Sequence, residues 1–233
     1  MYRVNILHLI DGAKQAEGLT VIIDVFRAFS LECYLYDMGV KEIRPVRTID
    51  EAFSLRNRIP NSILIGERGG KKCDGFDYGN SPSTISRERV AGKTIIHTTS
   101  AGTQGVVNAV GASEIITGSL VNAKAVAEYI MDKQPEAVSL VCMGNGGVRP
   151  AAEDELCAEY IKSILEGKEF PYLEKRVAEL QNIGGEHFFD QSRQEIFPEA
   201  DFWMCVKYNC FPFVIRVERD ELGFITKKEY AIV

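Results

Sequence analysis

Residues 20–27 of the chain read TVIIDVFR, a buried strand that ends in charged side chains. β-branched residues fill positions 21–23 directly before Asp24, and such a run favours a strand that is covered on both faces. A helical pattern follows over residues 28–38 and is stopped by Gly39. The stretch therefore predicts a strand, a short polar turn and a helix, which is the repeating unit of α/β proteins.

The same alternation continues along the first two thirds of the chain. Apolar runs at residues 62–65, 94–96, 114–116 and 138–141 predict strands, and residues 49–58, 105–110 and 123–131 predict helices. Thr48 and Glu51 form a capping box at the start of one of these helices. We therefore expect an α/β fold with three layers, α/β/α, around a mainly parallel or mixed central sheet.

The last third of the chain has a different pattern. Residues 152–165 and 172–181 predict helices, and the runs 202–206 and 212–217 predict two strands that pair or form an edge. Residues 1–233 are expected to form a single domain, the alternative being a small C-terminal annex at residues 185–233.

Composition excludes several classes of protein. The 233 residues carry 27 basic and 33 acidic side chains, a net charge of −6, and no long basic run, which argues against a nucleic-acid partner. No apolar stretch is long enough for a membrane span and no leader pattern is seen at the N-terminus, so we expect a cytoplasmic protein without a membrane partner. The 6 cysteines show no zinc-finger spacing, so reduced thiols are expected.

Polar residues follow each predicted strand, at the end where parallel sheets bind ligands. Asp24, Glu67, Thr99 and Asn145 are expected to lie at one edge of the sheet. The segments that follow the strands are 24–27, 66–70, 98–103, 118–119 and 144–147, and they carry two carboxylates, two arginines, hydroxyl groups and glycine-rich turns. Such a set has the groups needed to hold a metal ion and a phosphate.

The charged residues of this set each have a structural alternative. Asp24, at the end of a buried strand, needs a cation such as Mg²⁺, or else it caps the following helix. Glu67 is either a second ligand or the ion-pair partner of an arginine. Arg27 and Arg68 suit phosphate, carboxylate or sulfonate oxygens, and their alternative is an ion pair with the same acids.

The loops and the second acidic pair also allow two interpretations. Segments 98–103 and 144–147 can cradle an anion with backbone amides, or simply cap a helix and form a tight turn. Glu153 and Asp154 are further metal ligands, a general acid or base, or acids favoured by the dipole at a helix start. The P-loop and dinucleotide fingerprints are absent, since Arg87 and Arg149 stand where each requires a glycine.

Five motifs follow one another along the chain: segments 22–28, IIDVFRA; 66–70, GERGG; 75–82, GFDYGNSP; 98–103, TTSAGT; and 153–155, EDE. In this order they resemble the 2-phosphosulfolactate phosphatase family. The resemblance spans residues 20–210 and implies an α/β/α fold peculiar to the family. It implies a Mg²⁺-dependent phosphatase that cleaves 2-phospho-3-sulfolactate to 3-sulfolactate and phosphate, a step of coenzyme M biosynthesis.

The resemblance and the expected convergence together assign a site. Asp24, Arg27, Glu67 and Arg68 would be catalytic, and Mg²⁺ would lie on Asp24 and one or two of Glu67, Glu153 and Asp154. Substrate would contact Gly69, Asn80, Ser81, Thr98, Thr99, Ser100, Thr103, Asn145 and Gly146. Spacing leaves the nucleophile open between Asp24, Cys142 and a metal-bound water.

The sequence departs from the family pattern at two places. Ser100-Ala101 stands where an Asn follows the threonine pair in many relatives, which affects a substrate contact, and Ala151-Ala152 replaces Ser-Leu before the acidic pair. The expected partner is a small anionic phosphate ester, and the apolar run 202–217 favours a homodimer. The alternatives are a metal-dependent phosphatase for another phosphorylated 2-hydroxy acid and a non-catalytic module that binds an anionic metabolite.

Overall fold

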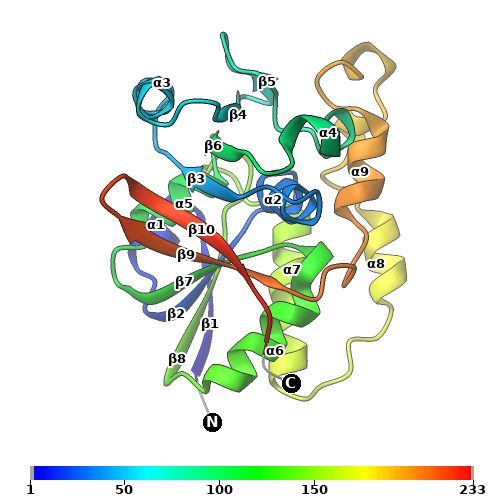
Figure 1. Cartoon of the computed structure of the whole chain (residues 1–233). Coiled ribbons are helices and arrows are strands. Elements are labelled where there is room, and N and C mark those ends of the chain that lie inside the picture. The colour runs from blue at the N-terminus through cyan, green and yellow to red at the C-terminus, as the bar shows by residue number, and fades with distance from the viewer. Residues whose placement is uncertain (1–2, 232–233) are drawn as a thin grey trace.

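The computed structural model describes residues 3–231, which form a mixed sheet with helices on both sides (Figure 1). The ten strands of this part are β1 (Arg3–His8), β2 (Gly18–Ile23), β3 (Glu42–Pro45), β4 (Ile63–Arg68), β5 (Lys71–Lys72), β6 (Thr94–Thr98), β7 (Ala112–Gly118), β8 (Ala137–Cys142), β9 (Val214–Asp220) and β10 (Gly223–Glu229). Its α-helices are α1 (Leu9–Lys14), α2 (Ala28–Asp37), α3 (Ile49–Arg58), α4 (Arg87–Val90), α5 (Gly102–Asn108), α6 (Ala123–Lys133), α7 (Ala152–Leu165), α8 (Leu173–Glu179) and α9 (Glu199–Cys205). The predicted α/β/α class is confirmed.

Two parallel groups of strands make up the sheet. The order is β1-β8-β2-β7-β9-β10-β3-β6-β4-β5, in which β1, β8, β2 and β7 run parallel, as do β3, β6 and β4. The antiparallel hairpin β9–β10 joins the two groups, pairing with β7 on one side and with β3 on the other. Figure 1 shows this hairpin crossing the molecule between the lower group and the upper group.

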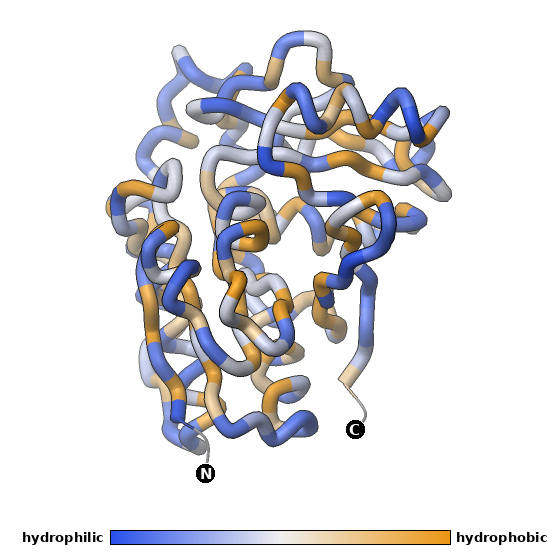
Figure 2. Tube along the Cα trace, turned by 90° about the vertical axis from the view of Figure 1, so that its left-hand side faces the viewer, coloured by the Kyte–Doolittle hydropathy of each residue, from blue (hydrophilic) through white to orange (hydrophobic). Residues whose placement is uncertain are grey.

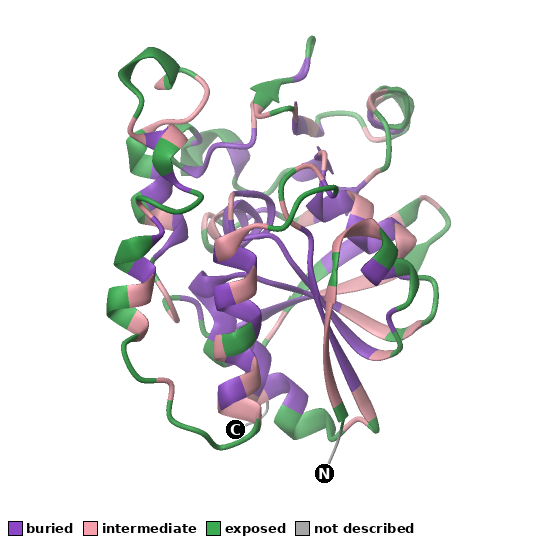
Figure 3. Cartoon of the chain, turned by 180° about the vertical axis from the view of Figure 1, so that it is seen from behind, coloured by how far each residue is buried: buried purple, intermediate pink, exposed green. Residues whose placement is uncertain are grey.

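The central strands are apolar on both faces because each face packs against helices. Val21 and Ile23 of β2 belong to a core with residues of α6 and α7, whereas Ile22 between them packs with residues of α1, α2 and α5 on the opposite face. Figure 2 shows apolar segments alternating with polar turns along the chain, and Figure 3 shows the central strands largely buried while the outer helices expose one side. This burial explains why residues 20–23 lack the polar alternation of an exposed strand.

The C-terminal third differs from the prediction in two respects. Residues 202–206, predicted as a strand, lie mostly in α9, which follows Pro198 and has Glu199 and Asp201 in its first turn. Phe202 and Cys205 are fully buried, and this spacing of three residues matches one face of a helix. The prediction was wrong because a short apolar run does not distinguish a strand from a helix.

The second difference concerns the sheet itself. The predicted run 212–217 overlaps β9, which lies inside the sheet between β7 and β10 rather than pairing with residues 202–206. The strands β1, β3, β5 and β10 were not predicted, since they are partly exposed or at most four residues long. Within residues 3–231, no helix combines the length and the apolarity that crossing a bilayer requires. All six cysteines are free thiols.

Candidate active site

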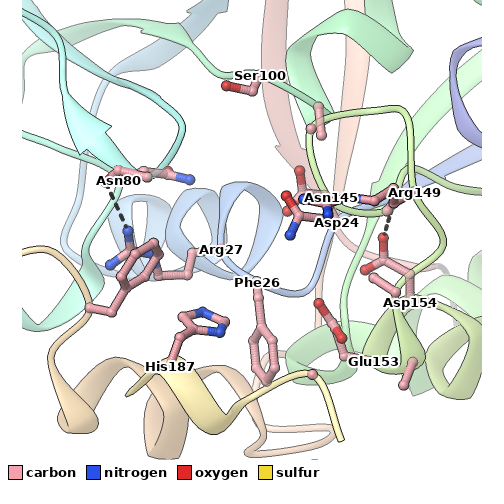
Figure 4. Close-up of a pocket in the computed structure, with 18 of the residues that line it drawn as sticks. Asp24, Phe26, Arg27, Asn80, Ser100, Asn145, Arg149, Glu153, Asp154 and His187 are labelled. Atoms are coloured by element: carbon pink, nitrogen blue, oxygen red, sulfur yellow. Dashed lines mark hydrogen bonds between the residues drawn. The ribbon is translucent and has the colours of Figure 1, made fainter. Parts of the chain in front are cut away.

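A cavity of about 680 Å³ lies where the carboxyl ends of the two parallel groups meet (Figure 4). Loops that follow β2, β4, β6 and β8 form its walls, with the start of α7 and a segment from the last third of the chain. Asp24, Glu67 and Asn145 line this one cavity, whereas Thr99 lies in an adjoining hollow shared with Ser100. The expected convergence is therefore observed, although β2 and β4 are separated by five strands in the sheet order.

Asp24 is held at the start of α2 and is 5% exposed. The amide of Ala28 donates to its Oδ1 at 3.0 Å, so the helix-capping role considered for this residue is present. A side chain at Gly102 would place its Cβ 2.8 Å from Asp24 Oδ2, so the absence of one lets the carboxylate approach the start of α5. Burial, helped by the nearby charge of Glu67, raises the pKa of Asp24 to about 6.

Glu153 lies in the first turn of α7 beside Asp24. Its Oε2 atom is buried and has no hydrogen-bond partner among the described residues. Burial and then the negative charges of Asp24 and Glu186 raise the pKa of Glu153 to about 8. A buried carboxylate with a free oxygen beside a second carboxylate is a place where a cation would be stabilised.

Asp154 braces two loops. Its Oδ1 accepts from the amide of Val25 at 2.8 Å and its Oδ2 accepts from the amide of Gly144 at 2.7 Å. These bonds connect α7 with the loops that follow β2 and β8. Burial and the charges of Glu153 and Asp24 raise the pKa of Asp154, while the two amides favour its ionised form.

Glu67 makes a similar brace on the opposite wall. Its carboxylate accepts from the amide and the hydroxyl of Ser100, at 2.6 and 3.2 Å, and from the amide of Gly70 at 2.7 Å. The glycine-rich loop after β4 and the loop after β6 are thereby held together. Glu67 and Asp154 each use both oxygens in this way, whereas the buried Oε2 of Glu153 has no partner among the described residues.

Arg27 adopts the structural alternative considered for it, with a different acid. Its Nη1 donates to Asp201 of α9 at 2.6 Å, and both side chains are buried, 3% and 0% exposed. Asp201 also accepts from the hydroxyl of Ser81 and the amide of Ser83. The Arg27 guanidinium, which lies 4.9 Å from the centre of the Phe197 ring, thus fastens α9 and the preceding loop to the cavity wall.

Arg68 does not line the main cavity but the adjoining hollow. Its guanidinium donates to the carbonyl oxygens of Glu67 and Arg47 and to Thr98 Oγ1. These bonds hold the Arg68 side chain in the adjoining hollow, outside the lining of the main cavity.

The residues expected to contact substrate divide into two sets. Those that line the cavity are Gly69, Asn80, Ser100, Asn145 and Gly146. Those outside its lining make internal bonds: Ser81 to Asp201, Thr98 to Arg47 and Arg68, and Thr99 and Thr103 to each other. The second set shapes the loops that carry the first.

Further residues line the cavity besides those of the assigned site. Arg149, Arg193, His187, Phe26 and Phe197 all line it, the last three from elements that converge near the Arg27 side chain. Within residues 3–231 neither Arg149 nor Arg193 forms an ion pair with a carboxylate. Burial and then the charges of Arg193 and Arg27 lower the pKa of His187 to about 4, so this ring is neutral near pH 7. His187 is 160 positions from Arg27 in the sequence, and no local sequence pattern predicts that its segment reaches this cavity.

Cys142 is unsuited to nucleophilic attack. It is 1% exposed, it does not line the cavity, and burial followed by the charge of Asp154 raises the pKa of its thiol. Its sulfur lies in a group with a ring nitrogen of His8 and a carboxylate oxygen of Glu155, in which all three atoms are within 4.8 Å of one another. Of the three nucleophiles left open by the sequence, Asp24 and water remain.

The cavity therefore combines the neighbouring carboxylates of Asp24 and Glu153 with two arginines, Arg149 and Arg193, that form no ion pair among the described residues. Turns rich in backbone amides complete its lining. Carboxylate oxygens suit a hard divalent cation, and arginines and amides suit phosphate, carboxylate or sulfonate oxygens. Metal-assisted hydrolysis of a small phosphate ester uses both kinds of group.

Comparisons with known proteins agree with this chemistry. The sequence profile described as 2-phosphosulpholactate phosphatase matches residues 5–220. A probable 2-phosphosulfolactate phosphatase of Bacillus subtilis (strain 168) is 33% identical over 205 residues, which cover 87% of this chain and 88% of the relative. Relatives of the same description from Caldicellulosiruptor saccharolyticus and Thermotoga maritima are each 41% identical, over 153 and 138 residues, or 62% and 58% of their own lengths.

Proposed function

The chain belongs to the 2-phosphosulfolactate phosphatase family, and on that premise we propose that it hydrolyses 2-phospho-3-sulfolactate to 3-sulfolactate and phosphate in the cavity described above, with the help of Mg²⁺. The proposal includes the step of coenzyme M biosynthesis that this product implies. One observation carries the metal requirement: the buried, unpartnered Oε2 of Glu153 beside the carboxylate of Asp24.

The donor set fits a hard divalent cation. Asp24 and Glu153 would hold Mg²⁺, because oxygen ligands from one or two carboxylates are what this ion takes from a protein at a phosphate site. The bound ion would neutralise charge on the phosphoryl oxygens and so lower the barrier to transfer. Glu67 and Asp154 support the proposal differently, by holding the loops that carry these ligands and the amide donors in fixed positions.

The carboxylate and the sulfonate of the substrate need cationic side chains that are not already paired with a carboxylate of the protein. Arg27 is paired with Asp201, which leaves Arg149 and Arg193 as the arginines of the cavity suited to the carboxylate and the sulfonate. Neutral His187 adds a hydrogen-bonding group on the same side as Arg27. The aromatic rings of Phe26 and Phe197 also line the cavity and would reduce the access of water to the bound substrate.

A substrate panel tests the proposal. Phosphate release from 2-phosphosulfolactate, phospholactate and phosphoglycerate is measured with metal-stripped protein, with and without added Mg²⁺. We expect Mg²⁺-dependent release that is fastest with the sulfonate-bearing ester, and a loss of at least about 100-fold in Asp24→Asn, since an amide keeps the shape but not the charge. Equal rates with all three esters would contradict the proposed preference for 2-phosphosulfolactate. A full rate without Mg²⁺ would contradict the proposed metal requirement.

A further inference from the structure

A fully buried pair of side chains lies behind the cavity wall. His97 of β6 and Glu32 of α2 are both 0% exposed, and His97 Nδ1 lies 2.8 Å from Glu32 Oε1. The other ring nitrogen, Nε2, lies 3.2 Å from Oδ1 of Asn80. Asn80 lines the cavity while only 5% of it is exposed, so it connects the buried pair with the place where substrate binds.

The charge of Glu32 can be compensated by one group only. Within residues 3–231 its carboxylate forms an ion pair with His97 alone, and its Oε2 has no partner. A net negative charge in this dry position would be costly, so the pair is stable as a neutral unit that holds one shared proton between Oε1 and Nδ1.

Both neutral arrangements place a proton on His97 Nε2. If Glu32 is ionised, His97 is an imidazolium with protons on both nitrogens. If Glu32 is protonated, its hydroxyl donates to Nδ1 and the ring proton is on Nε2. In either arrangement Nε2 donates to Asn80 Oδ1, which fixes the orientation of the amide.

The orientation of Asn80 decides what the cavity presents to an anion. With Oδ1 bound to His97, the NH₂ group is the end left over, and Figure 4 shows this nitrogen directed into the cavity. No protein group accepts from it among the hydrogen bonds of the described residues. The wall therefore offers two N–H donors with no competing protein acceptor.

We propose that Glu32 and His97 are positioning residues that hold the Asn80 amide as an N–H donor to an anionic oxygen of the bound substrate. The pair contacts Asn80 and not the cavity, so it acts only through this side chain. The inference rests on the proposed function for the identity of the ester, but not for the direction of the amide.

A magnetic resonance measurement tests the proton directly. Long-range ¹H–¹⁵N spectra of the imidazole nitrogens, assigned with a His97→Gln variant, should show His97 Nε2 protonated near pH 7 in the wild-type protein. Titration with inorganic phosphate should shift the side-chain NH₂ signals of Asn80. An unprotonated Nε2 would overturn the proposal, and so would NH₂ signals that do not respond to phosphate at concentrations that saturate the cavity.

A double-mutant cycle tests the coupling. Replacing both buried groups, Glu32→Leu with His97→Leu, leaves no unpaired charge and retains volume, so the protein should fold. We expect kcat/KM to fall about 10- to 100-fold in Asn80→Ala, the effect of losing a hydrogen bond to a charged group. The apolar pair should lower it by a smaller factor, and Asn80→Ala in that background should cost less than about threefold more.

Additive losses would contradict a positioning role, because a merely structural pair would act independently of Asn80. If the apolar pair does not fold, the state of Nε2 in the wild-type protein still decides the question. If the wild-type protein shows no activity on 2-phosphosulfolactate, the proposed function fails, whereas the phosphate response of Asn80 still tests this inference.

Discussion

Replacement of Glu153 by glutamine should make the metal-free protein more stable at alkaline pH while removing its response to Mg²⁺. The carboxylate is buried beside Asp24, and its Oε2 has no hydrogen-bond partner within residues 3–231. Glutamine keeps the shape of the side chain and carries no charge, so the variant separates the cost of the buried charge from the packing of α7.

The size of the effect follows from the pKa of Glu153, which burial raises from 4.5 to about 8. Between these values the folded protein holds a proton that the unfolded chain has released, so the free energy of unfolding falls as pH rises, by at most about 1.4 kcal/mol per pH unit. From pH 6 to pH 8 this loss amounts to about 2 kcal/mol, and Glu153→Gln should not show it.

Urea unfolding at pH 6 and pH 8, followed by circular dichroism, measures these free energies. The experiment is run in a chelator and in Mg²⁺ at about 100 times its Kd, which should stabilise the wild-type protein by about 2.7 kcal/mol. Glu159→Gln is the matched control, since Glu159 lies on the same helix but is half exposed and paired with Arg176. Glu153 is not the titrating metal ligand if Glu153→Gln loses as much stability as the wild type between the two pH values, or if Mg²⁺ stabilises both proteins equally.

Three other predictions concern groups around the cavity. Arg149→Ala and Arg193→Ala should each lower kcat/KM for 2-phosphosulfolactate about tenfold or more. For the arginine that binds the sulfonate, the loss of kcat/KM should be smaller with phospholactate. Equal losses with both esters would show that the arginine binds a group that the two esters share. Asp201→Asn should lower the free energy of unfolding by about 3–5 kcal/mol in urea titrations, because Arg27 is left buried without its partner. If the free energy of unfolding falls by less than about 1 kcal/mol, which is what an exposed ion pair contributes, the buried pair is not important for stability. Gly102→Ala should weaken Mg²⁺ binding in calorimetry, since the added Cβ would lie 2.8 Å from Asp24 Oδ2, and unchanged affinity would remove Asp24 from the site.

Local sequence patterns predicted the strand ends and most of the helices. The β-branched run before Asp24 predicted β2, and the helix at residues 152–165 was predicted with the bounds that α7 has. These predictions succeed because burial on two faces and the signals at helix ends act over a few neighbouring residues. Within each parallel group, the convergence of the loops follows from the parallel direction of the strands. The two groups run in opposite directions, because three antiparallel pairings lie between β7 and β3, so strand direction alone does not predict that their loops meet in one cavity.

Partners far apart in the sequence could not be predicted in this way. Arg27 pairs with Asp201, which is 174 positions away, and nothing near Arg27 distinguishes this acid from Asp24 or Glu67. The same limit applies to Arg193 and His187, which reach the cavity on a segment that follows α8. The hairpin β9–β10, which separates the two parallel groups, depends on pairing with strands about 100 residues away in sequence on the β7 side and about 180 residues away on the β3 side.

The predicted homodimer was based on the apolar run 202–217, and the structure gives that run another role. Phe202, Phe213 and Val214 are buried within the chain itself, and Trp203 is the large apolar side chain of the run that is well exposed. The dimer therefore stays a prediction, which sedimentation of the purified protein would test.

A crystal structure with Mn²⁺ and 3-sulfolactate would test the central claim most directly, because the anomalous signal of Mn²⁺ locates the ion without assumptions about its ligands. We expect one strong peak about 2.0–2.2 Å from carboxylate oxygens of both Asp24 and Glu153, with the sulfonate near Arg149 or Arg193. A peak that avoids Glu153, for example one held by His8, Cys142 and Glu155, would contradict it.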